Sequence, residues 1–353
     1  MSKLLSIVIP VYKVEPYINK CLDSLLIYTT DNAGKKVLDS ERMEQLDILI
    51  VNDGTPDRSA ELSREYVKKY PKYFRQIDKE NGGHGSVWNL GVKDAQGKYL
   101  RFLDSDDWLT NLDKLIDILS QTDADLVITP TIDHCESNKN WRQEILDMQW
   151  GTVYDADTFD WRGNRSQANY IFHHCCTYKT KVLRQYHPLF LEKQPYDDSI
   201  LCIAPMTGAK SLVAYDFVVY HYLMDRPGQS ISTSVRQRNL EAIIKAKKQI
   251  ISFAEEHPLE ESSTKYAYWK IKLPKIYSSS YSAHFHLPYK QEKQKIAEWD
   301  KWVQSRHTNI NTPIIQLYRN LPFFLFCIVR RILTILVQLK RMMTTNHLFK
   351  KVD

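Results

Sequence analysis

The sequence predicts an α/β protein with a mainly parallel central sheet, followed by a helical C-terminal region. Three observations support this prediction. Between residues 5 and 129, short apolar runs typical of buried strands alternate with helical patterns. Polar and acidic residues follow the ends of several of these runs. From about residue 236 onward, the apolar residues repeat with helical spacing.

The first strand is expected over Leu5–Tyr12, and the next apolar residues repeat at the spacing of one helix face. A second apolar run, Leu46–Val51, precedes a helix that begins near Pro56. A glycine-rich turn then leads to a short helix over Ser86–Asp94 and a strand over Lys98–Leu103. Repeated strand–helix units indicate parallel pairing, because parallel strands need a long crossover connection.

The second half of the chain is less regular and rich in aromatic residues. We expect a strand over Leu126–Thr129 and a last strand over Val213–Tyr222. The change to helical patterns sets the main boundary. The predicted parts are an α/β domain over 1–235 with halves 1–110 and 111–235, a helical region over 236–312, and a tail over 313–353.

Composition excludes several classes of protein. The six cysteines form no C-x-x-C pair, which argues against a zinc ribbon or a disulfide framework and favours a reducing cytosol. The apolar N-terminus lacks a small-residue cleavage site, so no export is expected. Nine basic residues and one acidic residue lie between Lys301 and Asp353, which leaves the rest of the chain slightly negative. This distribution argues against a nucleic-acid partner and favours an anionic membrane surface.

An acidic cluster, Asp104–Asp107, closes the strand expected over Lys98–Leu103. Alternate side chains of an extended segment point to one side, so Asp104 and Asp106 could share one target. Hard oxygen ligands suit Mg²⁺ or Mn²⁺, which usually bind one or two carboxylates together with substrate phosphates. For an isolated D-x-D the alternative is a helix cap by Asp107 or Thr110. No G-K-[ST] follows a glycine run, so a P-loop is excluded.

Four segments resemble, in order and spacing, the successive motifs of glycosyltransferase family 2. They read SIVIPVYKVEPYINKCLDSL, ILIVNDGTPDRS, ENGGHGSVWNLGVKDAQGKYLRFLDSDDW and YDD…YHYLMDRPGQSIS. The resemblance covers roughly residues 1–235 and leaves the tail outside. It implies the GT-A fold and an inverting transfer of sugar from a nucleoside diphosphate with a divalent metal, Mn²⁺ or Mg²⁺.

The resemblance also implies roles for residues at the strand ends. Asp53 is expected to accept a hydrogen bond from the nucleotide base. Asp106 and Asp104 are the expected metal ligands. The full set of expected nucleotide contacts is Pro10, Val11, Tyr12, Glu15, Asp53, Asp104 and Ser105. For Pro10 and Tyr12 the alternative is a strand-ending turn with a packing aromatic.

The donor phosphates and sugar are expected to meet two other segments. Gly83 and His84 belong to the family's glycine-containing turn, where backbone can approach a phosphate. A plain turn and a solvated histidine are the alternatives there. Arg226 and Ser230 match the family's terminal segment, and Arg226 is the expected phosphate contact.

An inverting transfer also needs a base for the acceptor hydroxyl. By resemblance this base is Asp198, with Asp197 at a position where Glu is more usual; the alternative is an acidic pair at a helix N-terminus. The run from His173 to Cys176 is interpreted as structural, because adjacent residues do not easily converge on one ion. His221 could join the metal or phosphate, but strand alternation would point it away from Tyr220 and Tyr222, and a filling role in the core or at the surface is the alternative.

The tail from Pro322 to about Met343 forms an amphipathic helical pattern. Its apolar face contains Phe324, Leu325, Ile328, Ile332, Ile335, Leu336 and Leu339. Arg330 and Arg331 would each cost about 2.5–3.5 kcal/mol at the centre of a bilayer. We therefore expect a peripheral helix, with a helix packed on the enzyme or another subunit as the alternative. The expected lipid contacts are Arg319, Arg330, Arg331, Lys340, Arg341, Lys350 and Lys351.

Together these expectations describe an enzyme at the cytoplasmic face of the cell membrane that extends a lipid-linked or polymeric glycan, with a UDP-sugar as the favoured donor. A dTDP- or GDP-sugar donor is the alternative within this class. A noncatalytic protein that binds sugar nucleotides or a membrane surface is the alternative outside it. A homo-oligomer is compatible with the sequence.

Overall fold

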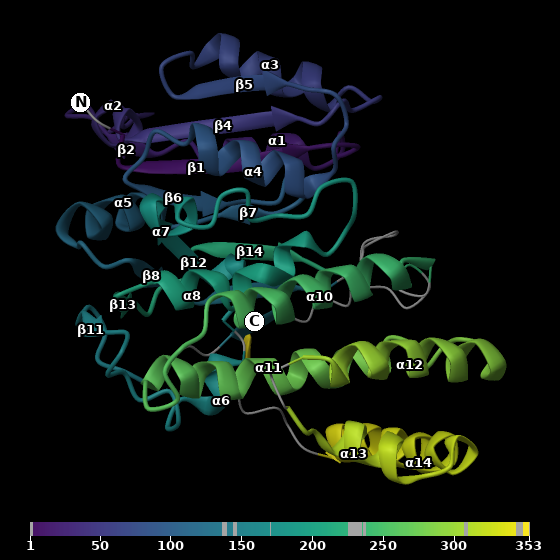
Figure 1. Ribbon diagram of the computed structural model, residues 1–353. Coiled ribbons are helices and arrows are strands. Elements are labelled where there is room, and N and C mark those ends of the chain that lie inside the picture. The colour runs from purple at the N-terminus through teal and green to yellow at the C-terminus, as the bar shows by residue number, and fades with distance from the viewer. Residues whose placement is uncertain are drawn as a thin grey trace.

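The computed structural model describes residues 3–135, 140–143, 147–169, 171–224, 235, 238–306, 310–343 and 349–352. Its central feature is an eight-stranded sheet with the order β11-β13-β8-β12-β6-β1-β4-β5 (Figure 1). The strands are β1 (Leu5–Val11), β4 (Leu46–Asn52), β5 (Phe74–Asp78), β6 (Tyr99–Phe102), β8 (Leu126–Ile128), β11 (Tyr154–Asp155), β12 (Cys176–Lys179) and β13 (Ser211–Ala214). Strand β12 is antiparallel to both neighbours and β11 is antiparallel to β13, whereas the other four pairs are parallel. The predicted mainly parallel sheet is confirmed.

Both faces of this sheet are buried, which explains the continuous apolar runs in its strands. In β1, Ile7 and Ile9 belong to one core cluster and Val8 to the other, because side chains alternate along a strand. The cluster of Ile7 also includes side chains of α1 (Ile18–Asp23) and α5 (Leu112–Gln121), with α3 (Ser59–Lys69) packed at its edge. The cluster of Val8 includes α4 (His84–Asp94) and the C-terminal helices.

A second sheet lies beside the first and has the order β15-β10-β9-β14-β7. Its strands are β7 (Trp108–Leu109), β9 (Thr131–His134), β10 (Asn140–Gln143), β14 (Tyr220–Leu223) and β15 (Phe349–Val352). The single strand predicted over Val213–Tyr222 is wrong. It is divided into β13, in the first sheet, and β14, in the second. The intervening residues connect the two sheets and carry Tyr220 toward the acidic cluster.

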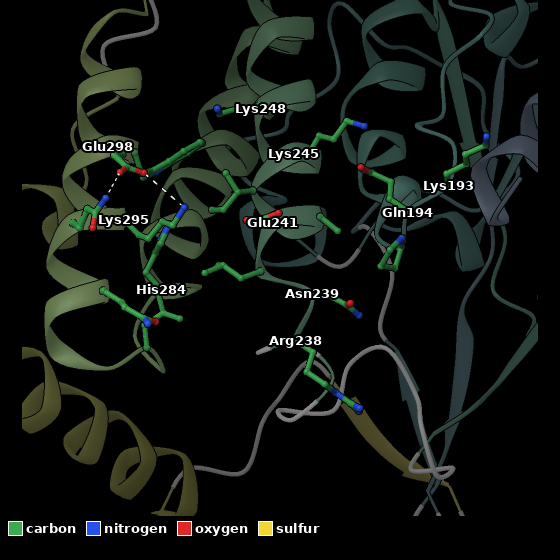
Figure 2. A pocket seen from close by; sticks show the side chains of 18 residues that line it. Lys193, Gln194, Arg238, Asn239, Glu241, Lys245, Lys248, His284, Lys295 and Glu298 are labelled. Atoms are coloured by element: carbon green, nitrogen blue, oxygen red, sulfur yellow. Dashed lines mark hydrogen bonds and ion pairs between the residues drawn. The ribbon is translucent and has the colours of Figure 1, made fainter.

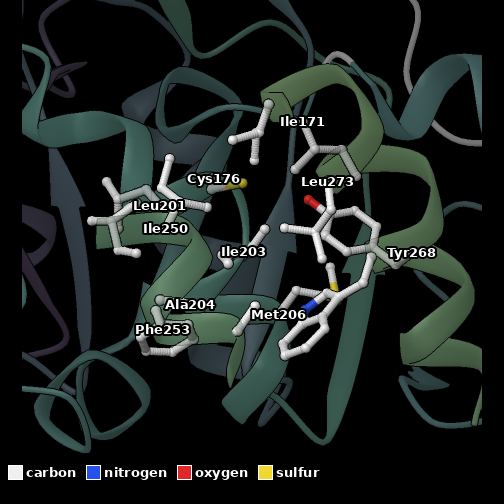
Figure 3. Packing of buried hydrophobic residues seen from close by; sticks show 14 of the residues in the cluster. Ile171, Cys176, Leu201, Ile203, Ala204, Met206, Ile250, Phe253, Tyr268 and Leu273 are labelled. Atoms are coloured by element: carbon white, nitrogen blue, oxygen red, sulfur yellow. The ribbon is translucent and has the colours of Figure 1, made fainter. Parts of the chain in front are cut away.

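The helical region packs directly on the sheet domain. It comprises α10 (Leu240–Glu256), α11 (Thr264–Ser282) and α12 (Tyr289–Gln304). Figure 3 shows Ile250 and Phe253 of α10 and Tyr268 of α11 around Ile203 and Met206. These residues share one core with the strands, so the boundary expected near residue 235 does not separate two independent cores.

Short elements complete the described chain. They are β2 (Tyr28–Thr30), β3 (Lys36–Leu38), α2 (Ser40–Glu44), α6 (Arg165–Ala168), η1 (His173–Cys175), α7 (Thr180–Arg184), η2 (Asp197–Cys202) and α8 (Ala204–Gly208). Two of them, η1 and η2, are 3₁₀ turns that carry histidine and aspartate side chains to the same place.

The tail forms α13 (Pro313–Asn320) and α14 (Phe323–Met343), which lie beyond α12 in Figure 1. The apolar face predicted for this helix points outward: Ile328, Ile332 and Ile335 are more than half exposed. Arg330, on the opposite face, is buried and its Nη2 lies 2.7 Å from Glu292 Oε1 of α12. Among the described residues, none of the helices combines the length and the apolar character that crossing a membrane requires.

Two of the arginines predicted to contact lipid form ion pairs within the protein. Arg330 binds Glu292, and Arg319 binds Asp300 with Nη2–Oδ1 at 2.8 Å, so both cations are engaged within the protein. Buried or half-buried arginine needs such a partner because an unpaired charge is costly to desolvate. In addition, the backbone of β15 pairs antiparallel with β10, which returns the segment containing Lys350 and Lys351 to the second sheet.

Candidate active site

The acidic cluster lies where β6 ends, as predicted, and its members have different environments. Asp107 is buried, accepts a hydrogen bond from Tyr220 Oη at 2.5 Å and another from the Leu223 backbone N–H at 2.8 Å. It therefore connects the cluster to β14 and does not cap a helix. Asp104 and Asp106 are half-buried. Ser105, between them, is buried.

His84 links this cluster to the second acidic motif. It is the first residue of α4 and follows Gly83, whose φ of 81° lies in a region that favours glycine. Its Nδ1 lies 3.0 Å from Asp197 Oδ2 and its Nε2 lies 3.3 Å from Asp104 Oδ1. Trp88, one helical turn later, packs against the imidazole with ring centroids 4.1 Å apart. The structure thus gives His84 two specific partners in place of the solvated role that was its alternative.

His173 and His174 also converge on Asp104. Their Nε2 atoms lie 3.6 and 3.8 Å from Asp104 Oδ2. The 3₁₀ turn η1 makes this possible, since it brings the two adjacent rings to a centroid distance of 3.8 Å. Adjacent side chains diverge in an extended strand, but this turn directs both rings toward the same carboxylate. The reason given for interpreting the run as structural therefore does not hold for His173 and His174.

The two carboxylates of the second motif differ in exposure. Asp197 is buried and its Oδ2 accepts a hydrogen bond from His84 Nδ1 at 3.0 Å. Asp198 keeps 42% of its side chain exposed, and its Oδ2 lies 4.0 Å from His173 Nδ1. Asp198 is therefore the carboxylate of the pair that an incoming molecule can reach. The contacts of His84 and His173 bring both acidic motifs into one site.

The charges in this site depend on one another. Burial disfavours an ionised Asp104, but the neighbouring His173, His174 and His84 outweigh this effect and hold the pKa of Asp104 well below its usual range. For His84, burial favours the neutral ring, yet Asp197 and Asp104 raise the pKa of the imidazole well above its ordinary value. The resulting arrangement is a cationic ring between two anionic carboxylates.

A buried cation behind the site was missed in the sequence. Arg101 on β6 is fully buried, donates to Thr177 Oγ1 at 2.8 Å and also donates to the backbone carbonyl of His174. It therefore fixes the turn that presents His174. Strand alternation would have placed Arg101 in the core, but the sequence offered no partner for it, because its acceptors lie more than 70 residues away.

At the expected nucleotide end, Asp53 already has three donors. It accepts from Lys79 Nζ at 2.7 Å and from the backbone N–H groups of Gly82 and Gly83, each at 2.8 Å. These bonds attach the glycine turn to the end of β4 and so position His84. A base contact by Asp53 remains a prediction. Lys79 is a second residue that sequence analysis did not select.

The first-strand residues are distributed over three environments. The Val11 side chain lies in the core. The backbone carbonyl oxygen of Val11 accepts from the Asp53 N–H at 3.1 Å, which joins the end of β1 to the residue that follows β4. Tyr12 is 42% exposed and Pro10 is half-buried at the strand end. Glu15 Oε2 accepts from the Arg58 N–H at 3.2 Å. Arg226 and Ser230 lie outside the described residues, and their expected phosphate contacts remain predictions.

His221 points away from the site, as strand alternation predicted. Its Nε2 lies 2.8 Å from Thr110 Oγ1 and its Nδ1 lies 2.8 Å from His134 Nε2. Tyr222, on the opposite side of the strand, stacks on His174 with ring centroids 4.7 Å apart. One face of β14 thus contacts the candidate active site through Tyr222, and the other face contacts Thr110 and His134 through His221.

The residues present fit a divalent cation. One ligand atom each from Asp104, His173 and His174 can lie within 4.8 Å of one another. His173 Nε2 is buried, and among the described residues it has no partner within 3.5 Å; its contact with Asp104 Oδ2 is longer, at 3.6 Å. A carboxylate with two imidazoles suits Mn²⁺ and similar ions better than Mg²⁺, which prefers oxygen ligands.

Comparison with known proteins identifies the family. The model described as "Glycosyl transferase family 2" matches residues 6–186, more than half of the chain. The chain belongs to glycosyltransferase family 2. Within the family it is 38% identical over 129 residues to an uncharacterized glycosyltransferase, EpsJ, of Bacillus subtilis, covering 36% of this chain and 33% of EpsJ. The predicted family membership is therefore confirmed.

Two further comparisons concern extent and fold. The B. subtilis minor teichoic acid biosynthesis protein GgaB is 27% identical over 183 residues, which cover 49% of this chain and 17% of GgaB. The matched part thus spans a third or less of these two relatives. A crystal structure of S. aureus TarS with UDP superposes with a TM-score of 0.58 at 15% identity, covering 83% of this chain and 78% of that one. This similarity confirms the predicted fold of a GT-A glycosyltransferase.

Proposed function

We propose that this protein transfers a sugar from a nucleoside-diphosphate sugar to a glycan acceptor with inversion at the anomeric carbon. The observation that carries the proposal is the joining of the two acidic motifs by His84 and His173. One motif follows β6 at the carboxyl end of the parallel strands, where ligands of such sheets bind. The other supplies a reachable carboxylate, Asp198, across from it.

In the proposed reaction Asp198 accepts the proton of the acceptor hydroxyl while that oxygen bonds to the anomeric carbon and the bond to the diphosphate breaks. Its partial exposure supports this role, since the base must meet an incoming alcohol. Asp197 is a positioning residue, because it is buried against His84. His84 contacts both Asp104 and Asp197, so it would keep the metal-binding carboxylate and the second acidic motif at a fixed separation.

A divalent cation, Mn²⁺ or Mg²⁺, bound by Asp106 and Asp104 would neutralise the charge that develops on the departing diphosphate. His173 and His174, which group with Asp104, would add two nitrogen ligands and would favour Mn²⁺. Gly83 and His84 lie where α4 begins, and helix N-termini favour phosphate oxygens. The Gly83 N–H donates to Asp53.

A UDP-sugar is the favoured donor, and a dTDP- or GDP-sugar is the alternative. The TarS structures that share this fold contain UDP or UDP-GlcNAc. The proposed acceptor is a lipid-linked or polymeric surface glycan, in line with the teichoic acid assignment of the related GgaB. A noncatalytic binding protein is less compatible with two intact acidic motifs that share one site.

We further propose that the protein works at the inner face of the cell membrane through the outward face of α14. Seven large apolar side chains of this helix are exposed, and burying each in the lipid interface would be favourable by about 1.5–3 kcal/mol at most. They are Phe324, Leu325, Ile328, Ile332, Leu333, Ile335 and Leu336.

The proposal is tested by measuring release of the nucleoside diphosphate from UDP-, dTDP- and GDP-sugars with Mn²⁺, with and without lipid-linked acceptors. Asp198→Asn should lower acceptor-dependent release at least 100-fold and leave UDP affinity within twofold. Asp113→Asn, an exposed carboxylate on α5, is the matched control and should retain activity. Undiminished turnover by Asp198→Asn would contradict the assigned base. Failure of the wild-type enzyme to release the nucleoside diphosphate from any donor would favour a noncatalytic role.

A further inference from the structure

A large cavity opens beside the acidic motifs and is separate from them. Its volume is about 810 Å³, and it lies between α10, α12 and the loop that contains Lys193 and Gln194 (Figure 2). Figure 2 shows Lys193 and Gln194 on one side, Lys295 and Glu298 on the other, and the start of α10 between them. The proposed reaction assigns nothing to this cavity.

The charges that line the cavity are mostly positive. The lining contains five basic side chains and two acidic ones. The basic residues are Lys193, Arg238, Lys245, Lys248 and Lys295, and the acidic ones are Glu241 and Glu298. Lys295 is 3.8 Å from Glu298, but the other four cations have no carboxylate within 4.0 Å among the described residues. Since the chain outside its tail is slightly negative, this concentration of cations without a carboxylate partner is local.

The cavity begins at the segment that carries the proposed base. Lys193–Pro195 immediately precede Tyr196 and the Asp197–Asp198 pair. The Lys193 N–H donates to the Gly82 carbonyl at 2.6 Å, which joins the wall of the cavity to the glycine turn. Gln194 Nε2 is buried and has no hydrogen-bond partner among the described residues.

We propose that this cavity binds an anionic part of the acceptor, namely phosphate groups carried by the glycan chain, while the terminal sugar reaches Asp198. Ammonium groups of lysine bind phosphate as point charges and do not require a fixed orientation, which suits a repeating polymer. Leu240, Ile244 and Leu287 are partly exposed in the same wall and offer apolar surface to sugar rings. This proposal rests on the proposed function and specifies the class of its acceptor.

The test uses the full-length protein and a fluorescently labelled synthetic hexamer of glycerol phosphate, with labelled maltohexaose as the uncharged probe. The triple variant Lys193→Gln, Lys245→Gln, Lys248→Gln should bind the phosphate hexamer at least tenfold more weakly in anisotropy titrations. Its binding should also depend less steeply on salt, because fewer counterions are displaced. The control triple variant Lys35→Gln, Lys68→Gln, Lys114→Gln removes equal charge from exposed lysines elsewhere and should bind as the wild type does.

Three outcomes would overturn the inference. The first is equal affinity of the wild type for the charged and uncharged hexamers. The second is an equal loss of affinity for the phosphate hexamer in both triple variants. The third is a loss of binding to phosphatidylglycerol vesicles alone, which would assign the lysines to lipid. The affinity for UDP, measured in parallel, separates the two proposals. A wild type that binds UDP but not the phosphate hexamer contradicts only the acceptor assignment, whereas one that fails to bind UDP contradicts the proposed function itself.

Discussion

Individual side chains in this site are held by partners from distant parts of the chain. His84 contacts Asp104, 20 residues away, and Asp197, 113 residues away. Asp53 binds the turn before His84, and Arg101 binds the turn that carries His174. The side chains of the site are therefore fixed by hydrogen bonds within the protein, as expected for a preorganised site.

Replacing His84 by Gln should leave the fold intact and impair transfer. The amide keeps the size of the imidazole but cannot supply a positive charge to both Asp104 and Asp197, so the two carboxylates should move apart. We expect kcat/KM for sugar transfer to fall at least 100-fold while the melting temperature changes by only a few degrees. His286→Gln, at an exposed histidine on the surface, is the control. Normal kcat/KM in His84→Gln would show that the bridge is dispensable.

A buried lysine should make stability depend on pH. Lys272 donates to the carbonyls of Asn169 and Ile171, just before the η1 turn, and burial lowers the pKa of its ammonium group to about 8. The folded protein then releases this proton at lower pH than the unfolded chain, whose lysine titrates near pH 10.4. Between these values the unfolded state binds more protons, so this group adds stability as pH rises, by up to about 1.4 kcal/mol per unit.

Comparison with Lys272→Met isolates this contribution. The difference in free energy of unfolding between wild type and variant, measured by urea titration at pH 7, 8.5 and 10, should shift in favour of the wild type as pH rises. Because the titrating tyrosines are common to both proteins, they cancel in the difference. A difference that stays constant over this range would mean that the folded and unfolded lysines titrate together.

At the scale of elements, α4 is the piece on which the site depends most. Its N-terminus carries His84, and its glycines let it lie against two neighbours. A Cβ at Gly85 would lie 2.1 Å from the Leu191 carbonyl oxygen and 3.0 Å from Asp197 Oδ2. At Gly91 it would lie 2.4 Å from Val8 Cγ1 of β1. One glycine therefore faces the loop before the second acidic motif, and the other faces the core.

The two glycines give a matched pair of variants. Gly85→Ala should push the loop of Leu191 and Asp197 away and lower kcat more than tenfold. Gly91→Ala should destabilise the core by about 1–3 kcal/mol through overpacking but leave kcat of the folded enzyme nearly unchanged. Thermal unfolding and kcat would be measured on both. If both variants lost activity only in proportion to their stability, the close approach at Gly85 would have no special role in the site.

The outward face of α14 is tested at the scale of the whole molecule. Ile328→Glu, Ile332→Glu and Ile335→Glu together should reduce cosedimentation with phosphatidylglycerol vesicles at least tenfold, because each change places a charge in the lipid interface. Val153→Glu, equally exposed on the sheet domain, is the control. These point changes are preferable to removing residues 313–353, since Ile315 and Phe326 belong to the core.

Light scattering distinguishes the alternative in which α14 packs on another subunit. In that case the wild type should be an oligomer that binds vesicles weakly, and the triple variant should be dissociated into monomers. Vesicle binding that is equal in wild type and triple variant would contradict the membrane role of this face.

Much of the fold could be predicted because it depends on local pattern. The buried strands and the α4 and α10 helices follow from apolar periodicity, and the acidic cluster follows from its place after β6. Features that depend on the tertiary structure could not be predicted. The break between β13 and β14, the burial of Arg330 against Glu292 and the return of β15 to β10 all require partners more than 30 residues away.

The site shows the same division. Asp104 could be selected because acidic residues at strand ends form a recognisable motif, and the family resemblance supplied Asp198. The cluster of His173 and His174 was seen in the sequence and rejected, because the backbone geometry of η1 was not evident from its residues. Within the described part of the chain, Arg101 donates to a hydroxyl and a carbonyl oxygen, which leave no charge pattern to recognise.

The buried pair between Arg330 and Glu292 fastens α14 to α12, and α10 to α12 lie between that helix and the catalytic strands in Figure 1. If the outer face of α14 lies on lipid, these helices hold the catalytic strands at a fixed distance from the bilayer. Only acceptors whose reactive end extends that far from the bilayer would then be substrates, so the enzyme would discriminate by the length of the glycan already built.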